Sequence, residues 1–451
     1  MEPSSRDIKV GVLGHYGNQN LGDEAIITAT VQHIERRLPN AQIIGISISP
    51  DDTAARFNIP SYPIRNVRRS SGPAANASAP AADARAAATG GLSTSEPALL
   101  RIKNALKRVP VLAVGIRWTG RVVRIAESIV LELGFLARSY RFIKGWRLIV
   151  VAGSNQFLDN FGGAWGFPYT VLKWTLLAKA SGAKIAFVSV GAGPLTGTLS
   201  KLFVRCALSL ADSISYRDES SKTMVEAWPY RFRGAVYPDL ANSLLFQGEG
   251  RAVAATGTAP KPVVGINPMP VFHQLYWHEW DEDRYRGYVA RLQEFATFLL
   301  TEGYPLFFFP TQAKDEIVIR DILAGLDPAL APPESHAAMV RSCREVSELM
   351  AVIETADIVV PTRFHGAVLA LHARKAVLAV CYYRKTRDLL IDRGQGAYAV
   401  DLQDFDAAEL IEKFKALAAN IRSELAKITV KNAEYRAALD RQYEAVFRLV
   451  R

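Results

Sequence analysis

An apolar strand, a glycine-rich turn and a helix open the sequence, and this succession constrains the fold more than any other feature. Residues 8–13 (IKVGVL) form an apolar run of strand length, and glycines follow at once. Apolar residues then recur at helical spacing until Pro39, and a second apolar run covers residues 42–48 (QIIGISI). Because a helix between two apolar strands is typical of parallel pairing, this order predicts a β–α–β unit and a parallel, doubly wound α/β sheet.

The same alternation of strands and helices recurs along the chain and predicts two Rossmann-like domains. We assign the first domain to residues 1–245 and the second to residues 263–430, with a cleft between them. Residues 246–262 are rich in Gly, Ala and Thr and predict a linker, and residues 431–451 predict a terminal helix. The pattern also predicts a strand over residues 236–240 and two separate helices over residues 407–419 and 424–448.

Composition excludes several classes of protein. The chain has 451 residues, of which 49% are hydrophobic and 22% charged, so a mostly disordered chain is excluded. Cys206, Cys343 and Cys381 lie far apart and offer neither a disulfide framework nor a zinc-binding spacing. The N-terminal residues lack a signal pattern, and no run of about 18 residues is free of charge. We therefore expect a cytoplasmic protein without a transmembrane helix.

Residues 70–97 differ from the rest of the chain. They consist mostly of Ala, Ser, Gly, Thr and Pro, with no aromatic residue. Such a segment cannot bury enough apolar surface to offset its ordering entropy, so we predict a disordered insertion.

A basic segment follows this insertion. Residues 101–147 contain eleven basic and two acidic residues, a net charge of +9 in a chain whose total is +10. The remaining residues are about neutral, so nucleic acid is not an expected partner. Two interpretations stay open for the basic helical segment. Its apolar face can pack on the first domain, or it can bind an anionic membrane surface reversibly, at the inner face of the membrane.

Three short motifs carry candidate functional residues, and the first follows the opening strand. Asn20, Gly22 and Asp23 lie in the sequence NLGDEA at the start of a predicted helix. Glycine lets a ligand approach the backbone closely, and helix N-termini favour anions. The motif therefore indicates a ligand-binding loop, or alternatively a turn whose side chains only cap the helix.

The second motif is SYRDE, residues 215–219, at the end of a short predicted strand. Ligands of open α/β sheets bind at such strand ends, where Arg217 could hold a carboxylate or phosphate through two hydrogen bonds. A solvent-exposed helix start is the alternative interpretation.

The third motif, PTRFHGAV, is the strongest. An apolar strand ends directly in Arg363, His365 and Gly366, and a helix begins there. Arginine, imidazole and unpaired helix amides would then converge on one anion-binding position. Two weaker candidates are Lys385, which follows another predicted strand, and the aromatic loop 272–280, which contains His273 and His278. The loop has the composition of a sugar-stacking surface or, alternatively, of a packed loop without a binding role.

Together these motifs resemble the polysaccharide pyruvyl transferase family. The resemblance covers about residues 10–394 without the insertion, and it rests on NxGDEA (20–25), an SVGxGPL-like turn (189–195), SxRDE (215–219), Pro238–Asp239 and RFHGA (363–367). It implies a glycosyltransferase-B-like fold. It also implies transfer of pyruvate from phosphoenolpyruvate, as co-substrate, to two hydroxyls of a sugar, with no metal and no other cofactor. The sugar would belong to a cell-surface polysaccharide or its lipid-linked oligosaccharide precursor.

The resemblance also implies roles for individual residues. Arg217 and Arg363 would hold the anion, and Asn20, Gly22, Gly366 and Lys385 would complete the substrate-binding set. His365 would be a phosphate ligand or a general acid, and Asp23 a general base toward the sugar hydroxyl.

One loop departs from the family pattern. After the strand at residues 148–152, where the family often has a run of glycines, the chain reads GSNQ, in the loop where we expect the acceptor sugar. Two other functions remain open. One is a nucleotide-sugar glycosyltransferase, which would favour an acidic residue that clamps a ribose late in the second domain. The other is a non-catalytic, membrane-tethered scaffold, which would have lost its anion ligands.

Overall fold

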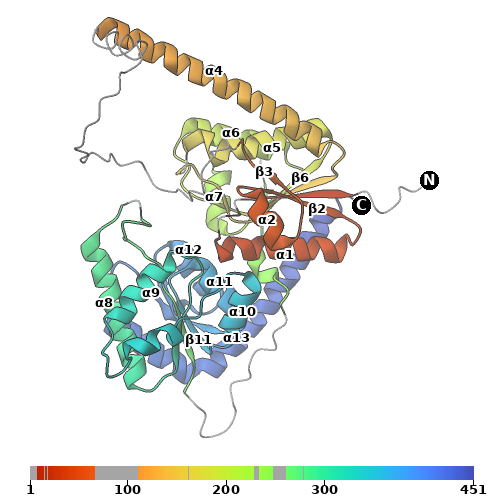
Figure 1. The fold of residues 1–451 in the computed structure, drawn as a ribbon. Coiled ribbons are helices and arrows are strands. Elements are labelled where there is room, and N and C mark those ends of the chain that lie inside the picture. Colours follow the sequence, from red (N-terminus) through yellow and green to blue (C-terminus); the bar gives the residue numbers. More distant parts are fainter. Residues whose placement is uncertain are drawn as a thin grey trace. The chain divides into compact units, whose positions relative to one another are not determined.

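The computed structural model describes residues 8–14, 16–17, 19–66, 110–160, 162–227, 233–246, 261–277 and 279–450. It divides into two compact units (Figure 1). One unit comprises residues 1–64 and 144–451, and the other residues 65–143. The predicted insertion at residues 70–97 and the first nine residues of the basic segment lie outside the described residues.

A parallel sheet organises the N-terminal half of the larger unit. Its strands lie in the order β3-β2-β1-β4-β6-β7-β8, and the short strand β5 also pairs with β6. The strands are β1 (Lys9–Leu13), β2 (Gln42–Ser47), β3 (Ser61–Pro63), β4 (Leu148–Ala152), β5 (Asn155–Phe157), β6 (Lys184–Ala192), β7 (Ser213–Tyr216) and β8 (Ala235–Val236). The helices are α1 (Leu21–Arg37), α2 (Pro50–Phe57), α5 (Phe167–Ser181), α6 (Thr198–Leu210) and α7 (Glu219–Glu226), with 3-10 turns η1 (Gly163–Trp165) and η2 (Leu240–Ser243).

A second parallel sheet organises the C-terminal half. Its strand order is β10-β9-β11-β12, and a separate pair joins β13 to β14. These strands are β9 (Val264–Asn267), β10 (Leu306–Phe308), β11 (Ile358–Pro361), β12 (Ala376–Val377), β13 (Ala379–Cys381) and β14 (Ala399–Asp401). The helices are α8 (Glu282–Thr301), α9 (Asp315–Ala324), α10 (Val346–Glu354), α11 (Phe364–His372), α12 (Arg384–Asp392) and α13 (Ala407–Phe447), with 3-10 turns η3 (Pro333–Met339) and η4 (Gly396–Tyr398). Alternating strands and helices therefore build two parallel sheets, as predicted.

Two elements differ from the prediction. The strand predicted over residues 236–240 ends at Val236, because Pro238 cannot continue a strand ladder and Asp239 caps the turn η2 by accepting a hydrogen bond from the Ala241 amide at 2.9 Å. The helices predicted over residues 407–419 and 424–448 form one continuous helix, α13. The predicted terminal helix at residues 431–451 is therefore helical to Phe447 but is not a separate element. No Gly or Pro interrupts the connecting residues, and Ile421 within them is buried.

Helix α13 joins the two halves of the larger unit. Near its end the Gln442 amide donates to the hydroxyls of Ser189 at 2.9 Å and Ser215 at 2.8 Å, on strands β6 and β7. Tyr443 lies 3.1 Å from the Ser243 hydroxyl in η2. One apolar core extends through the buried faces of α1, α10, α11 and the end of α13.

In the part of the smaller unit that the structure describes, the long helix α4 (Pro110–Ile143) covers most of the basic segment. None of the helices in the described ranges combines the length and the apolar character that crossing a membrane requires.

Candidate active site

Two topological switch points bring the predicted motifs into one region. Strand order reverses between β1 and β4 in the first sheet, and between β9 and β11 in the second. Open α/β sheets bind ligands beyond the carboxyl ends of strands at such points. The amide of Leu21, after β1, donates to the Thr311 carbonyl, after β10, at 3.1 Å, so loops from both halves are in contact here.

Asp23 lies in the first turn of α1 and is held on both sides. Asn20, the N-cap residue, accepts a hydrogen bond from the Gly22 amide at 3.1 Å and donates its own amide to Asp23 Oδ2 at 2.7 Å. Ser154, after β4, donates its hydroxyl to Asp23 Oδ1 at 3.1 Å. Burial raises the pKa of Asp23, an effect that His365, Ser154 and Arg217 partly offset. Asn20 is therefore both a helix cap and a positioning group for a carboxyl with a raised pKa.

A second carboxyl, Asp239, has the opposite character. Its Oδ2 atom lies 3.3 Å from Arg217 Nη1 and 3.7 Å from His365 Nε2. Burial alone would raise the pKa of Asp239, but His365 and Arg217 lower it to about 2. Asp239 is thus ionised at neutral pH, with the His365 ring as a near neighbour.

His365 lies directly against the turn that carries Asp23. A Cβ atom placed on Gly22 would come within 2.4 Å of His365 Nδ1, so this position requires glycine. His365 Nε2 is buried and, within the described part of the chain, makes no hydrogen bond. The imidazole therefore lies between two carboxyls with opposite pKa shifts and retains an unused polar atom.

Arg217 and Lys385 converge on one amide oxygen. Asn155 Oδ1 accepts from Arg217 Nη2 at 2.9 Å and from Lys385 Nζ at 3.1 Å. The Arg217 guanidinium also lies over the Phe364 ring, 4.9 Å from its centroid. Phe364 directly precedes His365, so the second and third motifs are in contact.

Lys385 lies in the first turn of α12 and crosses to the other half, where it donates to the Ala192 carbonyl at 2.7 Å. Across the described ranges, no carboxylate forms an ion pair with it. Burial, with a smaller effect of Arg217, lowers the pKa of Lys385 to about 8. Its positive charge is thus available to an anionic ligand.

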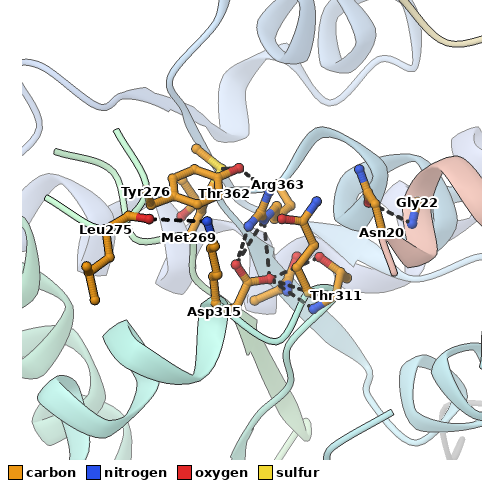
Figure 2. Close-up of polar contacts among 12 residues, drawn as sticks. Asn20, Gly22, Met269, Leu275, Tyr276, Thr311, Asp315, Thr362 and Arg363 are labelled. Atoms are coloured by element: carbon orange, nitrogen blue, oxygen red, sulfur yellow. Dashed lines mark hydrogen bonds and ion pairs between the residues drawn. The ribbon is translucent and has the colours of Figure 1, made fainter. Parts of the chain in front are cut away.

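Arg363 lies in a different environment, shown in Figure 2. Its Nε atom donates to both oxygens of Asp315, at 3.1 and 3.2 Å, and Nη2 also binds Asp315. Nη1 donates to the Tyr276 hydroxyl at 2.7 Å. Asp315, at the start of α9, is fully buried and also accepts from the amides of Thr311 and Gln312. Every nitrogen of the Arg363 guanidinium therefore has a partner inside the protein.

The structure brings most of the predicted site residues together. Six of them surround one position: Asn20, Gly22, Asp23, Arg217, His365 and Lys385. The other two lie elsewhere, because the Arg363 side chain pairs with Asp315 and Gly366 is buried against Asn267. Of the two histidines in the aromatic loop, His273 packs on Tyr285, with ring centroids 4.8 Å apart, and His278 lies outside the described residues.

Sequence reasoning assigned no individual role to Ser154, Asn155 or Asp315, and it included Tyr276 only as part of the aromatic loop 272–280. The signal for the first two was their place after β4, at the switch point. They lie in the loop where we expect the acceptor sugar, and they contact Asp23, Arg217 and Lys385. Among the described residues, no three His, Cys, Asp or Glu side chains gather as a metal site would require.

Comparisons with known proteins support both the fold and the motifs. A family model described as polysaccharide pyruvyl transferase matches residues 20–383. A search of curated protein sequences finds no significant match.

Solved structures share the fold at low sequence identity. UDP-GlcNAc 2-epimerase from Neisseria meningitidis, bound to UDP-GlcNAc, is 10% identical with a TM-score of 0.53, covering 98% of this chain and 99% of that chain. A glycosyltransferase from Rickettsia africae is 10% identical with a TM-score of 0.50, covering 99% of each chain. These similarities confirm the predicted fold of two Rossmann-like halves; they show the fold alone.

Proposed function

This chain belongs to the polysaccharide pyruvyl transferase family, as its motifs predicted, and from that premise we propose its reaction. We propose that it transfers a pyruvyl group from phosphoenolpyruvate to two hydroxyls of a sugar in a cell-surface polysaccharide or its lipid-linked precursor, forming a cyclic ketal. The observation that carries the proposal is the placement of His365 between Asp23 and Asp239, beside Arg217 and Lys385.

The cations account for binding of the donor. Phosphoenolpyruvate carries a phosphate and a carboxylate, and each gains from a charge-assisted hydrogen bond. Lys385 has no ion pair in the described part of the chain. Arg217 Nε is buried there without a hydrogen bond, although Asp218 Oδ2 lies 3.6 Å from it. We place the donor's anionic groups on these two side chains.

The proton transfers follow from the opposite pKa shifts of the two carboxyls. His365, which lies beside ionised Asp239, donates a proton to C3 of the donor. C2 then becomes an oxocarbenium-like centre, and the first sugar hydroxyl adds to it while its proton passes to Asp23. A raised pKa makes Asp23 a stronger base toward that proton.

The second bond to carbon completes the ketal. Phosphate leaves C2 with the electrons of the C–O bond, a second oxocarbenium-like centre forms, and the second hydroxyl attacks and loses its proton. The products are one ketal and one inorganic phosphate. The two hydroxyl protons balance the proton added at C3 and the proton taken up by the released phosphate.

The test is acceptor-dependent release of phosphate from phosphoenolpyruvate, with the ketal methyl group detected by NMR. We expect Asp23→Asn and His365→Asn each to lower kcat by about 10²- to 10⁴-fold while the protein still binds phosphoenolpyruvate. Turnover of a UDP-sugar in place of phosphoenolpyruvate would contradict the proposal and favour a glycosyltransferase.

We further propose that residues 101–147, which include helix α4, bring the enzyme to lipid-linked substrate at an anionic membrane surface. Each Lys or Arg near such a surface contributes about 1 kcal/mol at low salt. Co-sedimentation with anionic vesicles that high salt abolishes would support this role, and equal binding to neutral vesicles would contradict it.

A further inference from the structure

An aromatic side chain is exposed beside the candidate active site. Tyr383, the N-cap residue of α12, is 58% exposed, although it lies only two residues before the partly buried Lys385. On the neighbouring loop, Leu275 is 62% exposed. Large apolar side chains that gather in solvent near a polar site mark a surface that a ligand covers.

The exposed ring rests on a support of further aromatic rings. The centroids of Tyr383 and Tyr382 are 4.2 Å apart, and those of Tyr382 and Trp277 are 6.0 Å apart in an edge-to-face arrangement. Tyr276 extends this set, 6.3 Å from Trp277. Such contacts fix the orientation of the rings. Tyr383 therefore packs on an ordered aromatic cluster while its own ring remains exposed to solvent.

The aromatic set lies between Arg363 on one side and Lys385 of the proposed donor site on the other. Tyr276 accepts a hydrogen bond from Arg363 at 2.7 Å, as Figure 2 shows, and Lys385 follows Tyr383 on the same helix turn. Burial raises the pKa of Tyr382, and the charges of Arg363 and Arg217 both act to lower it, so its phenol lies within electrostatic range of both arginines.

From this arrangement we propose that Tyr383, supported by Tyr382 and Trp277, is a stacking platform for a pyranose ring of the acceptor saccharide. The inference rests on the proposed function, which requires the acceptor hydroxyls to reach a donor held at Arg217 and Lys385. A pyranose ring presents an apolar face of C–H groups that an exposed aromatic ring can cover, while its hydroxyls stay available for hydrogen bonds.

The kinetic test separates stacking on the ring from binding of the donor. Tyr383→Ala removes the ring, Tyr383→Phe retains it, and Lys385→Gln removes a charge from the proposed donor site. We expect Tyr383→Ala to raise KM for the acceptor about two- to tenfold and to leave KM for phosphoenolpyruvate unchanged. Tyr383→Phe should resemble wild type, and Lys385→Gln should show the reverse pattern. An unchanged acceptor KM in Tyr383→Ala would overturn the platform.

A direct binding test does not depend on turnover. Saturation-transfer NMR with a panel of methyl glycosides of common hexoses and N-acetylhexosamines should detect binding to wild type and to Tyr383→Phe. The signal should be lost in Tyr383→Ala, with unchanged Tm. Binding of no glycoside to wild type, or equal binding to all three proteins, would overturn the inference. If glycoside binding depends on Tyr383 but the protein does not consume phosphoenolpyruvate, the proposed function is wrong and the stacking platform is still supported.

Discussion

Arg217 and Arg363 both follow strands but have different surroundings. Both were predicted to hold the substrate anion. Arg217 directly follows β7, and Arg363 comes two residues after the end of β11. The hydrogen bonds of Arg217 to Asp239 and Asn155 leave Nε without one, next to a lysine that has no ion pair in the described residues. Arg363 has a partner at every nitrogen.

In the Arg363 region, one remote carboxylate occupies two of the three guanidinium nitrogens. Asp315 precedes Arg363 by 48 positions, and its negative charge is held in place by two backbone amides and the Thr311 hydroxyl. Arg217 also has carboxylates nearby, Asp239 at 3.3 Å and Asp218 at 3.6 Å, but within the described residues its Nε atom makes no hydrogen bond and the neighbouring Lys385 has no ion pair. This difference in unused donors suits the Arg217 region to binding, and the Arg363 region to holding the loop after β9 and the start of α9 together.

The largest effect should follow from disrupting the Arg363 region. Asp315→Ala leaves a buried guanidinium without its counter-charge, a change that costs about 3 to 5 kcal/mol of folding free energy. Urea denaturation measures the loss. The double variant Asp315→Leu/Arg363→Met should recover most of the stability, because replacing both charges removes the unpaired group. A loss below about 1 kcal/mol in Asp315→Ala would show that the pair is not the support we describe.

Next in size is the contrast between the two arginines in donor binding. Arg217→Gln should raise KM for phosphoenolpyruvate about ten- to hundredfold, because a charge-assisted hydrogen bond contributes about 1.5 to 3 kcal/mol. For Arg363→Gln we expect a smaller rise in KM and a larger loss of Tm. Equal increases in KM for the two variants would remove the distinction and restore the sequence-based prediction that both arginines hold the anion.

Local sequence was enough to predict the fold class and most of the candidate site. Apolar runs such as residues 148–152 and the glycines that follow β1 report strands and turns directly, and Asp23, Arg217 and His365 lie at strand ends or helix starts that those runs define. Their convergence follows from parallel topology, since the carboxyl ends of neighbouring strands meet at one edge of a sheet.

Long-range pairings could not be predicted in this way. Asn155 contacts Arg217, 62 positions away, and Lys385, 230 positions away, and no local pattern encodes either contact. The pairing of Arg363 with Asp315 was not predicted for the same reason. The continuity of α13 was not predicted, because the sequence of two adjacent helical segments is the same kind of pattern whether a loop or further helix connects them.

A smaller effect should come from the turn that packs on His365. A methyl group at Gly22 would clash with the imidazole, and overpacking of this kind costs about 1 to 3 kcal/mol. We expect Gly22→Ala to lower kcat about tenfold by displacing His365, with little change in KM for phosphoenolpyruvate. Gly287→Ala is a matched control, because a methyl group there would meet no atom closer than 4.0 Å. Unchanged kcat in Gly22→Ala would mean that the position of His365 is not critical.

The smallest effect concerns the charge of Lys385 and is visible only as a dependence on pH. Burial and Arg217 disfavour its ammonium form, and the pKa falls from 10.5 to about 8. The charged form therefore predominates at pH 7 and is lost as the pH rises through 8, so affinity for an anionic donor should fall in that direction. From pH 7 to 9 the charged fraction falls about tenfold, which limits the expected rise in KM for phosphoenolpyruvate to about that factor.

The control variant is Lys385→Arg, which should abolish the rise, because guanidinium stays protonated across this range. The ionisation of Asp239, with a pKa of about 2, is constant over the same range. If the rise in KM persists unchanged in Lys385→Arg, another group titrates. The charge of Lys385, which has no ion pair in the described residues, would then not bind the donor.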